Sequence, residues 1–98
     1  MDPVLDFESF KASLGAASPP ATASALSRAL WLDARGDWEG AHSIAQDVDD
    51  SDGARVHAYL HRKEGDLANA GYWYRRAGEK LFEGSLDAEW EALARRFL

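Results

Sequence analysis

The chain has 98 residues, 46% hydrophobic and 29% charged, which fits one small globular domain rather than a disordered chain. It has no cysteine, which excludes disulfides and thiolate metal sites and favours a cytoplasmic location. The net charge of −6 argues against general nucleic-acid binding, and no apolar run is long enough to span a bilayer. We therefore expect neither a nucleic-acid nor a membrane partner.

The first predicted element is a short helix. Apolar residues recur at spacings of three and four from Val4 to Leu14, and Gly15 follows them. This period predicts an amphipathic helix from Pro3 to about Leu14, lying against the rest of the domain.

A second helix is predicted to begin at the Ser-Pro-Pro sequence. Ser18 would be the N-cap, because the prolines that follow it are tolerated in a first turn, where their missing N–H costs nothing. We expect this helix to run to about Arg35. Gly36 and Asp37 then predict a tight turn, in which the glycine is left-handed and the aspartate caps the next helix.

The third predicted helix extends from Trp38 to about Val48. An acidic loop at residues 49–53 follows it and is expected to supply capping groups for a helix from Ala54 to Glu64. Gly65-Asp66 repeats the earlier turn. A further helix is therefore predicted from Leu67 to about Ala77.

Ser85 is predicted to cap the last helix, which has an apolar stripe ending at Phe97. Terminal elements of helical repeats shield the apolar faces that have no neighbour. We expect this helix to close the open end of the stack.

The chain contains an internal repeat. The residues Ala29, Gly36, Asp37 and Ala41 return 29 positions later as Ala58, Gly65, Asp66 and Ala70. A short repeat buries its apolar face by stacking on its neighbour. We therefore predict an all-α fold in one domain, residues 1–98. It comprises an N-terminal helix, stacked hairpins at about 19–50 and 52–78, and a capping helix at about 85–98.

The repeated G-D-x-x-x-A pattern, with an aromatic or aliphatic residue four positions on and a small residue seven on, resembles the tetratricopeptide helical hairpin. The stretch from Asp66 to Ala77 matches it best. The period of 29 is shorter than the family's repeat of about 34 residues, and only two units are recognisable. The stretch from His57 to Gly78 also resembles a group of short uncharacterised proteins, which implies the fold only. The tetratricopeptide resemblance implies a protein-interaction module.

His57 and His61 are four positions apart, so they share one helical face, and Glu64 extends that stripe. Such a pair can bind zinc with a third ligand, which would be Glu64, His42 or an acid of the segment 49–52. The zinc metalloprotease motif is absent, because alanine takes the place of its glutamate. In the alternative interpretation the histidines bond or stack between helices. We predict no metal or cofactor, and retain His57, His61 and Glu64 as the candidate metal ligands.

An aromatic and basic cluster follows in the helix predicted from Leu67. Helical geometry directs Trp73 and Tyr74 toward the core and leaves Tyr72, Arg75 and Arg76 on the outer side. Arginine makes bidentate contacts with carboxylate or phosphate, so this side could bind an anion. The alternative is intramolecular ion pairing with nearby glutamates.

We expect an interaction module or self-associating scaffold rather than an enzyme. Its predicted groove is lined by Trp31, His57, His61, Tyr72, Arg75 and Arg76. The partner would be a protein, an acidic peptide or a second copy of the chain. The alternative is a small metal- or anion-dependent enzyme centred on His57, His61 and Glu64.

Overall fold

The computed structural model describes residues 6–98, which form α-helices joined by short connections and contain no strand. In chain order the helices are α1 (Phe7–Ala12), α2 (Ala25–Ala34), α3 (Trp38–Asp47), α4 (Ser51–Glu64), α5 (Leu67–Ala77) and α6 (Leu86–Phe97), and the 3-10 turn η1 (Ser13–Gly15) follows α1. The predicted all-α class is confirmed. The predicted helix residues Pro3 and Val4 lie outside the described residues. Within them Asp6 is extended and caps α1, so the helix begins at Phe7 rather than continuing from Pro3.

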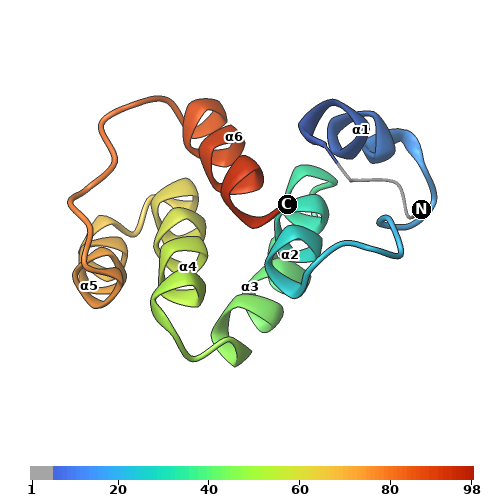
Figure 1. Ribbon diagram of the computed structural model, residues 1–98. Helices are drawn as coiled ribbons and strands as arrows, with labels where there is room; N and C mark the ends of the chain where they lie inside the picture. The colour runs from blue at the N-terminus through green and yellow to red at the C-terminus, as the bar shows by residue number, and fades with distance from the viewer. Residues whose placement is uncertain (1–5) are drawn as a thin grey trace.

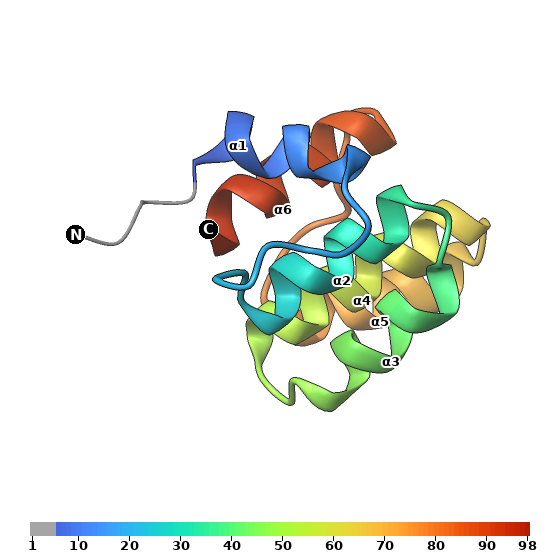
Figure 2. The same cartoon turned by 90° about the vertical axis from the view of Figure 1, so that its right-hand side faces the viewer.

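The helices α2 to α5 follow one another across the molecule, with α4 at the centre and α5 at one edge (Figure 1). The helix α5 packs mainly against α4, and α3 packs against both α2 and α4. The helix α6 lies across α2 and α4, and α1 lies beside α6 (Figure 2). No helix within residues 6–98 is long and apolar enough to cross a membrane.

Both predicted Gly-Asp turns are confirmed. Gly36 has φ +87° and Gly65 has φ +90°, the left-handed conformation that glycine adopts without a Cβ penalty. Asp37 accepts a hydrogen bond from the amide of Gly40 at 2.9 Å, and Asp66 accepts one from the amide of Asn69 at 3.2 Å. Each turn therefore ends one helix and caps the next.

Replacing Gly65 or Gly36 by alanine should lower the free energy of unfolding by about 1 kcal/mol, because an L side chain is strained at these angles. Gly71→Ala is the matched control. It lies inside α5, where an added Cβ would meet only Arg75 at an ordinary 3.6 Å, so it should stabilise by about 0.5 kcal/mol. Urea melts measure all three. A destabilising Gly71→Ala with neutral changes at the turns would contradict this account.

Two helix starts differ from the predictions. The N-cap of α2 is Ser24 rather than Ser18, and the side chain of Ser24 accepts from the amide of Ser27 at 3.2 Å. The reason is that Pro19 precedes another proline and is thereby disfavoured in the helical region. The helix α4 begins at Ser51 instead of Ala54, because Asp50 caps it.

The main core lies between α1, α2, α4 and α6, and its fully buried side chains include Phe10, Leu30 and Leu60. The Trp90 ring of α6 stacks on Phe10 with 5.9 Å between centroids, and its indole N–H donates to the carbonyl of Leu30 at 2.9 Å. The apolar face of α6 thus packs on α1 and α2. The helix α6 packs mainly against α2 and α4, while α5 packs mainly against α4.

Two buried carboxylates connect the helices. Glu89 of α6 accepts from Arg62 at 2.8 Å and from the hydroxyl of Tyr74, while Asp33 of α2 accepts from the hydroxyl of Tyr59 at 2.8 Å. Burial, and then the neighbouring carboxylates, raise the pKa of both tyrosines, so these hydroxyls remain donors. Lys63 completes the second network at 2.9 Å from Asp33.

Candidate functional site on α3, α4 and α5

Trp31 lies apart from the other predicted groove residues. It is 4% exposed within the main core, and its indole N–H donates to the carbonyl of Ser13 at 3.2 Å. The guanidinium of Arg35 covers its ring. Trp31 therefore holds η1 against α2 and contributes almost no accessible surface to a groove.

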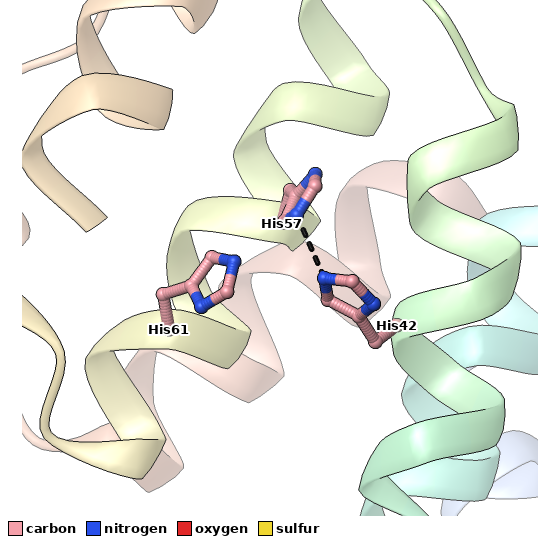
Figure 3. A group of neighbouring side chains, drawn as sticks. All are labelled: His42, His57 and His61. Carbon is pink, nitrogen blue, oxygen red and sulfur yellow. Dashed lines mark hydrogen bonds between the residues drawn. The ribbon is translucent and has the colours of Figure 1, made fainter. Parts of the chain in front are cut away.

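The structure brings His42 of α3 to the predicted pair His57 and His61 on α4 (Figure 3). The Nε2 atoms of His42 and His57 are 2.9 Å apart and share a hydrogen bond. Ring centroids are 4.8 Å apart for His57 and His61 and 5.3 Å apart for His42 and His61. Three imidazoles from two helices therefore form one cluster, which we call the histidine cluster.

Two tryptophans flank the histidine cluster. The Trp38 ring stacks on His42 with 4.9 Å between centroids, and the Trp73 ring stacks on His57 at 3.9 Å. The indole N–H of Trp38 also donates to the carbonyl of Leu60 at 2.9 Å, which fixes the ring on α4. These aromatic walls restrict rotation of the imidazoles.

Glu64 contacts the histidine cluster from outside. Its carboxylate lies 2.7 Å from Nδ1 of His61, so this nitrogen is the donor and the other, Nε2, has the lone pair when the ring is neutral. The side-chain amide nitrogen of Asn69 lies 3.4 Å from that Nε2, as a donor to a lone pair would. Glu64 thus orients His61.

The protonation of His57 follows from its surroundings. Burial, and then the proximity of His42 and His61, lower the pKa of His57 from its ordinary value to about 4. His57 is therefore uncharged at neutral pH. A neutral imidazole is a competent hydrogen-bond acceptor and metal ligand.

Tyr72, Arg75 and Arg76 are exposed on α5, as predicted, while Tyr74 is buried and Trp73 is half-buried. The guanidinium of Arg76 donates to the hydroxyl of Tyr72 at 3.2 Å and lies 5.4 Å from the centre of the Trp73 ring. Among residues 6–98, the guanidinium of Arg75 has no hydrogen-bond or ion-pair partner. The alternative expectation, ion pairs from these arginines to nearby glutamates, is not what the structure shows.

The other arginines differ in this respect. Each donates to a carboxylate or a backbone carbonyl: Arg28, Arg35, Arg55, Arg62, Arg95 and Arg96. Glu79 pairs with Arg55 and Glu64 with His61. Arg28 and Arg35 donate only to backbone carbonyls. Within residues 6–98, Arg75 and Arg76 are thus the arginines whose guanidinium groups donate to neither a carboxylate nor a backbone carbonyl.

A pocket of about 210 Å³ lies between the α3–α4 loop and α5. Its walls include His57, Trp73 and Arg76, with Asp49 and Asp50 at the loop. The pocket therefore opens on one side of the histidine cluster and reaches the basic side of α5.

The sequence predicts His57, His61 and Glu64 on one helical stripe. In the structure, Glu64 orients the ring of His61 by a hydrogen bond to Nδ1. His42 was one of three possible third members, and it is the one that meets both histidines. Trp38 and Asn69 were missed as members of this site. The spacing of four between Trp38 and His42 is the signal that could have indicated a shared face.

Comparison with known proteins gave no family model, no curated protein and no solved structure that matches this chain.

Proposed function

We propose that the chain is an interaction module that binds an acidic segment of a partner protein on the outer side of α5. The observation that carries this proposal is the pair of exposed arginines, Arg75 and Arg76, without a carboxylate partner among residues 6–98. Guanidinium groups recognise carboxylates by paired, charge-assisted hydrogen bonds. An acidic segment would supply the missing partners.

The apolar residues of α5 support a protein partner rather than a small anion. Leu67 and Tyr72 are 60% and 44% exposed on the same helix, and α5 packs mainly against α4. Tyrosine and arginine are enriched at the centres of protein interfaces. The outer side of α5, which we call the α5 face, therefore combines apolar contacts with positive charge.

We further propose that α2–α3 and α4–α5 are tetratricopeptide-like units. Both hairpins turn through a left-handed glycine followed by a capping aspartate, and α3 packs on α4 between them. Proteins of that family bind peptides, so this interpretation agrees with the proposed function by analogy of fold.

Replacing Arg75 and Arg76 together by glutamine should weaken binding of a fluorescein-labelled oligoglutamate peptide at least about tenfold. Both side chains are exposed, so we expect the melting temperature to change little. Fluorescence anisotropy at low ionic strength measures the affinity. Raising the salt concentration should weaken wild-type binding, because salt screens exposed charges.

The matched control is Arg95→Gln with Arg96→Gln, which changes the net charge equally on α6. These arginines pair with Glu91 and Asp52, so the control should retain peptide binding. Equal losses of peptide affinity in both double variants would show a non-specific charge effect and contradict the proposal. A fall in melting temperature confined to the α5 variant, without any peptide binding by the wild type, would indicate a structural role. Sedimentation of the unliganded chain tests the other partner considered, a second copy.

A further inference from the structure

We propose that His42, His57 and His61 form a binding site for a divalent transition-metal ion, with zinc as the fitting ion. The site adjoins the α5 face, since Arg76 lines the pocket beside it, but it takes no ligand from that face and does not depend on the proposed partner. Three imidazole nitrogens are a ligand set that zinc uses in proteins, and the fourth position then belongs to water or a bound molecule.

The spacing of the donor atoms suits a tetrahedral ion. One ring nitrogen from each histidine can be chosen such that all three lie within 4.8 Å of one another. Two nitrogens bound to one tetrahedral zinc are about 3.3 Å apart, given metal–nitrogen bonds of about 2.0 Å. The Nε2 atoms of His42 and His57 are 2.9 Å apart already. The separations of the three donors are therefore within about 1.5 Å of those that an ion requires.

The contacts of His61 are those of a metal ligand with an orienting carboxylate. Glu64 accepts from Nδ1 at 2.7 Å and leaves Nε2 as the nitrogen with the lone pair. A carboxylate bonded to the far nitrogen of a ligating histidine fixes the tautomer and increases the basicity of the ring. In Figure 3, one ring nitrogen of His61 faces the space beside His42 and His57. An ion there would replace the 3.4 Å contact with Asn69.

The surrounding structure holds the ligands in place and leaves a path to solvent. His57 and His61 lie on the 14-residue helix α4, while His42 is stacked on Trp38 of α3. The pocket lined by His57, Trp73 and Arg76 reaches the cluster from outside. Rigid helices with locked rotamers are the usual support for a metal site, and the pocket would admit the ion.

A neighbouring group offers a competing site. His61, Glu64 and Asp66 also have ligand atoms within 4.8 Å of one another, but Glu64 and Asp66 are exposed. Asp66 additionally caps α5 by accepting from Asn69. His42 belongs to the first group alone, and Asp66 belongs to the second alone, so these two residues distinguish the sites.

The test is a calorimetric titration of the chelator-treated full chain with zinc chloride near neutral pH. We expect one ion per chain and a rise in melting temperature, because an ion that binds only the folded state stabilises it. His42→Gln and His57→Gln should each weaken binding at least about tenfold, and Glu64→Gln should weaken it about 10- to 100-fold. Asp66→Asn should bind as the wild type does.

Absence of stoichiometric zinc binding by the wild type would overturn the proposal. So would binding that survives His42→Gln but is lost in Asp66→Asn, since the ion would then occupy the competing group. An NMR titration of the wild type with zinc tests the site without any substitution, so its result does not depend on whether the variants fold. One equivalent of zinc should shift the ring signals of all three histidines together, and a shift of His61 alone would contradict the proposed site.

Discussion

Replacing Glu89 by glutamine should lower the free energy of unfolding by about 3 kcal/mol. The Glu89 carboxylate is 3% exposed and accepts from both Arg62 and Tyr74. An amide of the same size has one accepting oxygen, so one of the two donors would face the new NH₂ group. The substitution would also leave the guanidinium of Arg62 without its counter-charge, which is costly where water is largely excluded.

The control for this substitution is Glu91→Gln on the same helix. Glu91 forms an exposed pair with Arg95, so its loss should cost less than about 0.5 kcal/mol. Denaturant melts of the two variants measure the difference. Equal stabilities would mean that Glu89 does not join α6 to α4 and α5 as described.

Replacing Gly53 by alanine should also destabilise by about 3 kcal/mol. A Cβ at this position would lie 1.8 Å from the carbonyl oxygen of Val48. That oxygen belongs to the backbone and cannot rotate away, so the α3–α4 loop would have to move. The substitution would disturb the first turn of α4, one turn before His57.

Gly15→Ala is the matched control, because an added Cβ there meets nothing within 4 Å. Its melting temperature should stay close to that of the wild type, whereas Gly53→Ala should lower it by several degrees. Equal melting temperatures for the two variants would contradict the close approach of Gly53 in α4 to Val48 at the end of α3.

Local chemistry made much of the fold predictable. The start of α5 follows from the capping Asp66 and the start of α6 from the capping Ser85, and apolar spacing gives the extent of each. Both helices lie where these signals predict them. The start of α2 could not be found from the capping residue type alone, because Ser18 and Ser24 are both serines, although the two prolines after Ser18 disfavour a helix there. What favours Ser24 is a contact distant in sequence: its hydroxyl donates to the carbonyl of Phe97 at 3.1 Å.

The candidate site was predictable to a similar degree. Helical spacing alone places His57 and His61 on one face of α4. It also places Arg75 and Arg76 on the outer side of α5. The choice of His42 as the third histidine depends on how α3 packs against α4, which no single helix encodes. The sequence predicts Trp31 to line a groove, because the spacing of apolar residues in α2 is the same whether another element covers that side of the helix or leaves it open. The packing of η1 on α2 covers it.

The most direct test of the account is an amide NMR titration of the isotope-labelled chain with the oligoglutamate peptide, since it locates the binding surface. We expect the largest shifts at Tyr72, Arg75 and Arg76 on the α5 face, with little change on α6. Shifts concentrated at Arg95 and Arg96 instead, or no shifts at peptide concentrations well above that of the protein, would contradict the proposal that α5 binds acidic partners.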